Sequence, residues 1–234
     1  MKSTERKIRH VAIIPDGNRH WAKKRGLLPW QGHVRAAKRI TEVVRAAFEL
    51  EIPYLTVWGG SYDNLTKRSE KEIRVLDNIY RSLAKKFIKD KDAGKRGVRI
   101  RVLGEWLKLL SKETVQALYR AEETTKEHNN YNLTLLIGYN GDREMIAAVN
   151  QLLSGGVKKI SEEDLKGRLW TKDLPPVNLI IRTGGEPHLS TGFMMWDTRH
   201  SQLYFTEKMW PDFTAKDIKD TIAYYERRER RLGA

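Results

Sequence analysis

A single acidic residue, Asp16, separates an apolar segment from a strongly basic one in the stretch HVAIIPDGNRHWAKKRG, residues 10–26. A carboxylate among cations can hold Mg²⁺ against a diphosphate, because Mg²⁺ takes one or two carboxylates and completes its coordination with phosphate oxygens and water. The same carboxylate could instead only neutralise its basic neighbours or cap a following helix near Asn18. Taken by itself, this segment favours the capping interpretation.

A second segment, IIRTGGEPHLS (residues 180–190), carries groups that bind anions. Arg182 ends an apolar run and is followed by Gly184, Gly185, His188 and Ser190. Adjacent glycines let backbone N–H groups approach a phosphate, and Arg and Ser side chains add further donors. The chain has neither the Walker A nor the G-x-G-x-x-G pattern, so this is not an ordinary nucleotide-binding loop. A Gly-Gly turn with a surface arginine explains the composition equally well.

A third polar segment, WGGSYDNLTKR, spans residues 58–68. After an apolar run it presents a series of polar side chains that includes Ser61, Asp63, Asn64, Lys67 and Arg68. An Asx-rich turn accounts for this pattern nearly as well as a binding role does.

Three other features have ordinary structural explanations. His33 follows Gly32 at the start of a predicted helix and could be a cap residue. The tryptophans, Trp21 among them, are individually better explained by packing. The basic tail RRERRLG, residues 227–233, is typical of a solvated helix face, although a dimer seam or an anionic membrane surface could use it.

Apolar runs with β-branched residues alternate with segments of helical periodicity along the whole chain. Strands are predicted over residues 11–14, 54–60, 98–104, 133–139, 178–185 and 203–206. Helices are predicted over residues 34–50, 69–89, 111–128, 143–153 and 162–169, with a last one after Thr214. Ser69 and Glu72 match the S-x-x-E capping box at a helix start, and one face of the helix over 34–50 would carry Val34, Ala37, Ile40, Val44 and Phe48.

This alternation predicts an α/β fold, with a mostly parallel central sheet of about six strands surrounded by helices. We find no repeat, low-complexity tract or linker, so residues 1–234 are predicted to form a single domain. Four polar segments follow predicted strands: Asp16 with its neighbours, residues 59–64, residues 138–144 and residues 182–190. In such folds, chemistry gathers beyond the carboxyl ends of the strands, so we expect these segments to meet there.

The composition limits the compartment and the partners. With 44 Lys+Arg against 30 Asp+Glu, the net charge is +14, which favours polyanions, anionic lipid surfaces or phosphorylated small molecules. No apolar run approaches the roughly 20 residues of a membrane span, and the first ten residues lack the apolar centre of a secretory signal. The absence of cysteine fits a reducing compartment. We therefore expect a cytoplasmic protein that could also touch the inner membrane face.

Taken in order, these stretches resemble the motifs of the cis-prenyltransferases, the undecaprenyl diphosphate synthase family. HVAIIPDGNRHWA resembles the family's opening H-V-A-I-I-x-D-G-N-x-R-W-A, Gly32-His33 its next element, and SYDNL its S-x-E-N-W. IGYNGDREMI is similar to G-Y-G-G-R-x-E-I, and NLIIRTGGEPHLS, QLYFTEKMWPDF and RERRLG are similar to the closing motifs. The resemblance runs from His10 to Gly233, and seven motifs in the right order make it specific.

The resemblance implies an enzyme that condenses isopentenyl diphosphate with an allylic diphosphate, farnesyl or geranylgeranyl diphosphate, and forms a cis double bond at each step. It implies a dimer, either of two identical chains or with a different partner chain. It also implies a hydrophobic tunnel between sheet and helices, for which the faces around Val57, Leu135 and Ile137 are candidates. Because the leaving diphosphate must be neutralised, positioned cations and Mg²⁺ are the expected catalytic groups.

Carried over by position, the resemblance implies a role for each polar residue. Asp16 would be the magnesium ligand. The allylic diphosphate would be held by Gly17, Asn18, Arg19, His20 and Trp21, with further cations from Lys67 and Arg68. The leaving group would be oriented, or the departing proton helped, by His33, Ser61 and Asn64. The isopentenyl diphosphate would be held by Arg182, His188 and Ser190.

The chain departs from the family pattern mainly at its diphosphate sites. His20 and His188 stand where the family has Arg, Gln202 where a Glu often assists metal binding, Asp63 where the family has Glu, and Pro29 where many members have Arg. Arginine binds phosphate through two donors and stays charged, whereas histidine offers fewer donors and titrates near neutrality. Ordinary substrate binding should weaken unless Arg19, Lys67 and Arg68 compensate.

Three functional hypotheses remain within the family. The first is an active enzyme with ordinary head-to-tail chemistry. The second is a variant of the same fold that uses another acceptor or joins prenyl units head-to-middle. The third is a subunit that supports an active partner, against which Asp16 argues, because such subunits typically lose this acid. A basic RNA-binding protein is a fourth class. The chain lacks the RRM and KH signatures, so we expect no nucleic acid partner.

Overall fold

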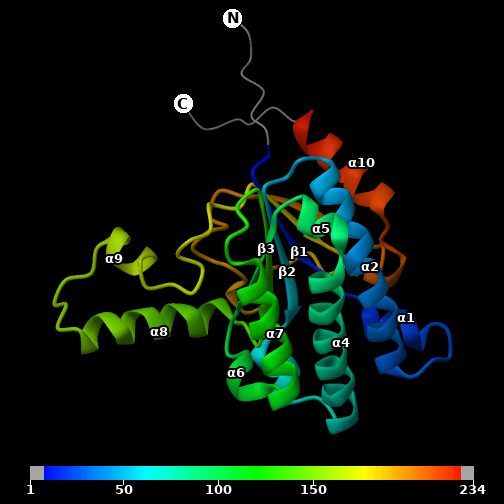
Figure 1. Ribbon diagram of the computed structural model, residues 1–234, viewed down its shortest axis with the longest axis horizontal. Coiled ribbons are helices and arrows are strands. Elements are labelled where there is room, and N and C mark those ends of the chain that lie inside the picture. The colour runs from blue at the N-terminus through cyan, green and yellow to red at the C-terminus, as the bar shows by residue number, and fades with distance from the viewer. Residues whose placement is uncertain (1–7, 228–234) are drawn as a thin grey trace, which may run out of the picture.

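The structure is a computed structural model that describes residues 8–227 (Figure 1). Its centre is a six-stranded sheet in the order β3-β4-β2-β1-β5-β6, in which every pair of neighbours is parallel. The strands are β1 (His10–Ile14), β2 (Tyr54–Gly60), β3 (Val98–Leu103), β4 (Tyr131–Ile137), β5 (Leu179–Arg182) and β6 (Gln202–Phe205). The predicted α/β architecture, including the number of strands, is confirmed.

Helices cover the sheet. They are α1 (Asn18–Lys23), α2 (Pro29–Glu49), α3 (Tyr62–Thr66), α4 (Glu70–Lys89), α5 (Lys91–Lys95), α6 (Trp106–Leu109), α7 (Lys112–Thr125), α8 (Gly141–Ser154), α9 (Glu162–Lys166) and α10 (Ala215–Glu226), with short 3₁₀ turns η1 (Ser190–Gly192) and η2 (Trp210–Asp212). In Figure 1, α2, α4 and α7 lie side by side in front of the sheet, α10 lies beside α2, and α8 and α9 extend away from the rest. Among the described residues, no helix is long and apolar enough to cross a bilayer.

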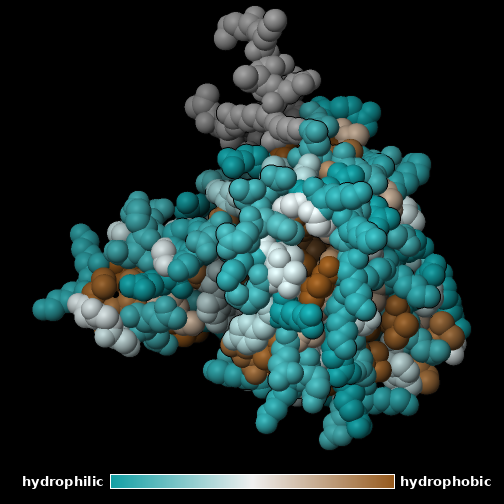
Figure 2. All heavy atoms as spheres, viewed as in Figure 1, coloured by the Kyte–Doolittle hydropathy of each residue, from teal (hydrophilic) through white to brown (hydrophobic). Residues whose placement is uncertain are grey.

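Both faces of the sheet are buried, as parallel sheets require. In β1, Val11 and Ile13 pack into the larger core on the side of α2, α4 and α7, while Ala12 and Ile14 pack into a smaller core on the opposite face. Outside these cores the surface is strongly polar. Figure 2 shows hydrophilic residues over most of one face, including the length of α4.

Two predictions about the helices need correction. Helix α2 begins at Pro29, because proline suits a first turn whose N–H groups have no partner. Its buried face carries residues such as Ala36, Val43 and Ala47, whereas Val34 is 48% exposed. Of the five residues predicted on that face, Val44 and Phe48 are buried in the larger core and Ile40 packs against it, so the prediction is wrong mainly at Val34.

The second correction concerns the predicted capping box. Ser69 caps α4 and accepts a hydrogen bond from the Glu72 N–H at 3.3 Å. The Glu72 side chain does not return to the Ser69 backbone and contacts α2 instead. At the last helix the predicted cap is present in both directions, between Thr214 and Asp217.

The strand order creates a crevice at the carboxyl edge of the sheet. From β1 the chain moves first to β2 on one side and later returns to β5 on the other, so β1 and β5 flank the point where the order reverses. Ligands bind at such points in open α/β sheets. Ile14 pairs with Arg182 in register, which brings the residues after both strands to the same edge.

Candidate active site

A cavity of about 500 Å³ lies at this edge, beyond the ends of β1, β2 and β5. It is lined by most of the polar residues singled out in the sequence: Asp16, Gly17, Asn18, Arg19, His20, His33, Ser61, Asn64, Arg68, Arg182 and Ser190. The fold thus brings together three of the four polar segments expected to meet, whereas residues 138–144 are not among those that line the cavity. The roles assigned to these residues remain predictions.

Asp16 and Arg182 form the centre of the strand side of the cavity. Arg182 Nη2 donates to Asp16 Oδ2 at 2.7 Å, and Nη1 donates to Ser190 Oγ at 2.8 Å and to the His188 carbonyl oxygen at 2.6 Å. The Arg182 side chain is buried, whereas that of Asp16 is 44% exposed. The arginine is therefore fixed, and the carboxylate keeps an accessible side toward the cavity.

The backbone at Asp16 is held against the loop after β5. The Asp16 N–H and the Thr183 Oγ1 lie 2.9 Å apart, and the Thr183 hydroxyl is also 2.9 Å from the Asp16 carbonyl oxygen. Gly17 has a φ of +90° and would place a Cβ 3.1 Å from the Gly184 Cα. A side chain at either position would push the two loops apart, since left-handed backbone and close approach both favour glycine.

Several buried polar atoms beside the cavity have no hydrogen-bond partner within residues 8–227. They are Asn18 Oδ1, Thr191 Oγ1 and Arg182 Nε, and all three residues line the cavity. Buried polar groups are almost always paired in folded proteins. Unpaired donors and acceptors beside a cavity are expected where a polar ligand completes them.

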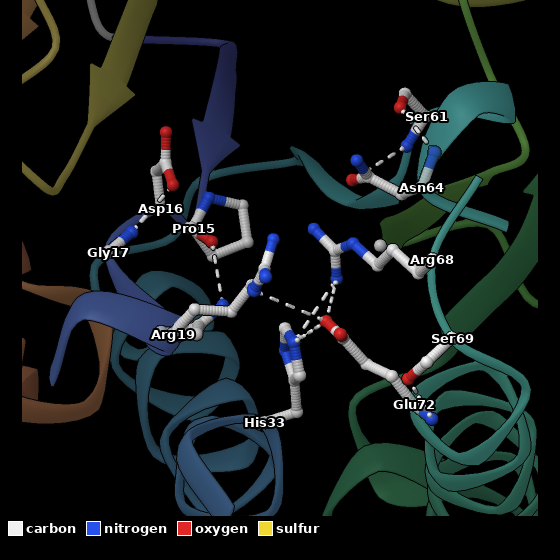
Figure 3. A network of polar contacts seen from close by, with 12 residues as sticks. Pro15, Asp16, Gly17, Arg19, His33, Ser61, Asn64, Arg68, Ser69 and Glu72 are labelled. Carbon is white, nitrogen blue, oxygen red and sulfur yellow. Dashed lines mark hydrogen bonds and ion pairs between the residues drawn. The ribbon is translucent and has the colours of Figure 1, made fainter. Parts of the chain in front are cut away.

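The helix side of the cavity is organised around Glu72, shown in Figure 3. Glu72 Oε1 lies 3.0 Å from His33 Nε2, 3.0 Å from Arg68 Nη1 and 3.8 Å from Arg19 Nε. The contact with His33 is the main influence that holds the pKa of Glu72 below its usual range, and Arg68 adds to it against the opposing effect of burial. Burial also lowers the pKa of Arg68, partly offset by Glu72.

Ser61 and Asn64 are engaged in local structure. Ser61 caps α3, with its Oγ accepting from the Asn64 N–H at 3.0 Å, and Asn64 Oδ1 accepts from the Ser61 N–H at 3.4 Å. In Figure 3, Ser61 and Asn64 lie across the site from Asp16. The Asn64 amide nitrogen has no partner in the described part of the chain and remains available as a donor.

Three predicted site residues do not line the cavity. Trp21 is buried in α1 with the Arg25 guanidinium 4.3 Å from its ring centre, so its position fits packing. Lys67 points outward and pairs with Asp63 at 2.8 Å. His188 is 57% exposed and lies behind Ser190, 3.1 Å from its Oγ. We therefore assign Trp21 to packing and Lys67 to the surface.

Other sequence features also find their places. His33 lies in the second turn of α2, so it is not a cap residue. Gln202 pairs with Leu179 at the amino end of β6 and is not among the residues that line this chain's cavity. Of the basic tail, residues 228–233 lie outside the described residues, and Arg227 caps α10.

The cavity has an apolar side between α2 and α4. It is formed by Ala36, Ala37, Ile40, Leu76 and Ile79. Val57, Leu135 and Ile137, the expected tunnel wall, are instead fully packed into the larger core. The prediction assigned the apolar wall of the cavity to strand residues, whereas residues of α2 and α4 form it. Helices pack over the faces of a parallel sheet, so these strand side chains are buried beneath the helices.

Sequence reasoning missed Glu72, Thr183 and Thr191 as site residues. Glu72 was assigned to a cap because the S-x-x-E spacing is local, whereas its partner His33 is 39 residues away. Thr183 had a usable signal, since it directly follows Arg182 at the strand end. Thr191 had none, because its place depends on the left-handed backbone of η1.

Comparisons with known proteins give the family and the fold. The family model described as "Putative undecaprenyl diphosphate synthase" matches residues 14–233. A tritrans,polycis-undecaprenyl-diphosphate synthase (geranylgeranyl-diphosphate specific) of Pyrococcus abyssi is 37% identical over 96% of this chain and 86% of the relative. An isoprenyl transferase of Thermotoga maritima is 39% identical over 96% of each chain.

One solved structure is similar over nearly its whole length. It is a lavandulyl diphosphate synthase from Lavandula x intermedia in complex with dimethylallyl diphosphate. It superposes with a TM-score of 0.90 at 28% identity, covering 97% of this chain and 99% of that one. A probable undecaprenyl diphosphate synthase from Campylobacter jejuni shares the fold, with a TM-score of 0.78 at 24% identity.

Proposed function

The chain belongs to the undecaprenyl diphosphate synthase family of prenyl-group transferases, and on that basis we propose that it condenses isopentenyl diphosphate with an allylic prenyl diphosphate to build a cis-polyprenyl diphosphate. The observation that carries the proposal is the division of one cavity into two sides. Asp16, Arg182, Arg19 and Arg68 mark its charged side, and aliphatic residues of α2 and α4 form the other. Such a cavity suits a molecule with a diphosphate head and a hydrocarbon tail.

The charged side supplies what ionisation of an allylic diphosphate requires. Breaking the carbon–oxygen bond leaves negative charge on the diphosphate, and cations positioned beforehand stabilise that charge without reorganising. Arg68 and His33 are held in place by Glu72. The backbone after Gly17 and the side chains of Arg19 and His20 complete the proposed allylic site.

The second diphosphate is assigned to the strand side. Arg182 is fixed by Asp16 and Ser190 and has an unpaired Nε beside the cavity. Holding isopentenyl diphosphate there would bring its alkene beside the allylic carbon, which converts a two-molecule encounter into a reaction within one complex. Asn64, with its free amide donor, is proposed to orient the leaving group.

The residues present fit a bound Mg²⁺. Within residues 8–227, no group of three or more acidic, His or Cys side chains could form a complete metal site. Mg²⁺ needs only one or two carboxylates when diphosphate oxygens and water complete its coordination. The half-exposed Asp16 meets that requirement. When bound, the ion would neutralise charge on the departing diphosphate.

We further propose that the allylic substrate is farnesyl or geranylgeranyl diphosphate, and that the protein works in the cytoplasm as a homodimer, with a heterodimer as the alternative. The net charge of +14 supports contact with an anionic inner membrane face.

A second candidate is prenyl transfer to another acceptor, or head-to-middle coupling. It is favoured by His188, which stands in the position of the family arginine yet is mostly exposed and does not line the cavity. The strand side consequently has one cation fewer for isopentenyl diphosphate than the family pattern implies.

The test is a product analysis. The purified protein is incubated with Mg²⁺, labelled isopentenyl diphosphate and farnesyl or geranylgeranyl diphosphate, and the extracted lipids are separated by chain length. Linear polyprenyl diphosphates support the first proposal. A branched or ether product supports the second. Incorporation only after a partner chain is added would assign this chain to a supporting subunit.

A further inference from the structure

The sequence motifs gave Glu72 no role in the site. Its side chain is 5% exposed and does not line the cavity. Each of its three partners does line it: Arg19 from α1, His33 from α2 and Arg68 from the turn before α4. One buried carboxylate thus contacts three basic side chains that line the cavity (Figure 3).

The arrangement leaves part of Arg68 available to a ligand. Its Nη1 lies 3.0 Å from Glu72 and 3.1 Å from His33. Its Nη2 and Nε have no protein partner in the described chain, and the residue lines the cavity. Because a free arginine side chain samples many rotamers, anchoring one nitrogen reduces the entropy lost when the others bind a diphosphate.

A purely stabilising ion pair would not require this geometry. A buried pair often adds little net stability, because the loss of hydration offsets the attraction. Here the acid meets three basic groups, so the cluster keeps a positive charge even with His33 neutral. That surplus faces the cavity, where a diphosphate would compensate it.

We propose that Glu72 is a positioning residue that aims Arg68 and His33 at the allylic diphosphate; this rests on the proposed function. Glu72 touches neither substrate nor metal in this arrangement and acts only through its partners. The Asp16–Arg182 pair on the strand side makes no contact with it. Removal of the Glu72 charge should therefore affect the allylic substrate more than isopentenyl diphosphate.

The test compares Glu72→Gln and Glu72→Asp with the wild type. In Glu72→Gln, the side chain keeps its shape and loses its charge. We expect KM for the allylic diphosphate to rise about 10-fold or more, and kcat to fall up to about 10²-fold, as misplaced catalytic groups do. KM for isopentenyl diphosphate should change less than threefold or so. Glu72→Asp, which keeps the charge but shortens the reach, should recover part of the loss.

A matched control exists on the opposite face of the sheet. Glu144 is also buried and accepts hydrogen bonds from the Tyr139 hydroxyl at 2.5 Å and the Thr171 N–H at 2.8 Å, and it is not among the residues that line the cavity. Glu144→Gln should alter thermal stability without separating the two KM values. Equal changes in both KM values for Glu72→Gln, or the same pattern in Glu144→Gln, would reduce Glu72 to a structural residue.

A binding measurement separates this proposal from the proposed function. Calorimetric titration with inorganic pyrophosphate reports on the cations whether or not prenyl transfer occurs. Glu72→Gln should bind pyrophosphate about 10-fold more weakly than the wild type, and Glu144→Gln should bind it equally well. Unchanged affinity in folded Glu72→Gln would overturn the positioning role. A wild type that binds pyrophosphate but makes no prenyl product would refute only the proposed function.

Discussion

Arg182 Nη2 lies 2.7 Å from Asp16 Oδ2, although 166 residues separate them in the chain. The pair joins the ends of two adjacent parallel strands, and the same guanidinium also holds Ser190 and the His188 carbonyl. One contact therefore fixes the loops after β1 and β5 relative to each other. The two residues are expected to act together.

Asp16→Asn should reduce turnover by roughly 10²- to 10³-fold, the scale of losing one group that stabilises charge in a transition state. Because the Asp16 side chain is 44% exposed, the stability loss should stay near about 1 kcal/mol. Incorporation of labelled isopentenyl diphosphate measures turnover, and thermal unfolding checks the fold. Wild-type rates in Asp16→Asn would remove its metal role.

Addition of EDTA should abolish wild-type turnover.

Arg182→Lys should raise KM for isopentenyl diphosphate about 10-fold or more, because lysine cannot replace a planar group that contacts Asp16, Ser190 and the His188 carbonyl at once. Steady-state kinetics with each substrate varied in turn provides the measurement. Lys67→Ala is the control, since this lysine is exposed and its ion pair within residues 8–227 is with Asp63. An equal effect in both variants would mean that general positive charge, and not the geometry of Arg182, matters.

Gly32→Ala should destabilise the contact between α1 and α2. A Cβ at position 32 would lie 2.0 Å from the Asn18 carbonyl oxygen, so α1 would have to move. Overpacking of this kind costs about 1–3 kcal/mol, and displacement of Asn18 should also weaken substrate binding. Urea unfolding measures the first effect. Gly94→Ala is the control, because nothing lies within 4 Å of a Cβ there.

Acidification should destabilise the protein through His10. This ring is fully buried between the Pro175 carbonyl and the Thr56 hydroxyl, and burial lowers the pKa of His10 from 6.5 to about 4. Between these values the unfolded chain binds the proton and the folded chain does not, so stability falls as pH falls. At about 1.4 kcal/mol per pH unit, the loss from His10 approaches about 3 kcal/mol at pH 4.

Denaturant unfolding from pH 7 to pH 4 measures this loss, and His10→Gln should flatten the profile. Glu72, whose pKa is lowered, contributes stability above its unfolded pKa of about 4.5 that is lost below it. Its effect therefore lies mostly outside the pH range assigned to His10. A His10→Gln profile as steep as that of the wild type would contradict the assignment.

The sheet could be predicted because its signals are local. Residues 54–60 form β2 with the predicted limits, since apolar β-branched runs ended by glycine are readable along the chain. The expected meeting of Asp16, Ser61 and Arg182 followed from one rule about parallel strand ends. The predictions that the structure does not support concern the direction in which individual side chains point. The outward turn of Lys67, the burial of Trp21 and the reach of Glu72 to α2 are decided by packing between distant segments.

The position of β1 has a consequence for biosynthesis. This strand precedes the other five of the sheet in the chain, yet its neighbours in the finished sheet are β2 and the much later β5. A nascent chain that ends before residue 179 can pair β1 on one edge only, and its Asp16 has no Arg182 to meet. On the proposed function, fragments that end before β5 should therefore remain inert however well their helices form.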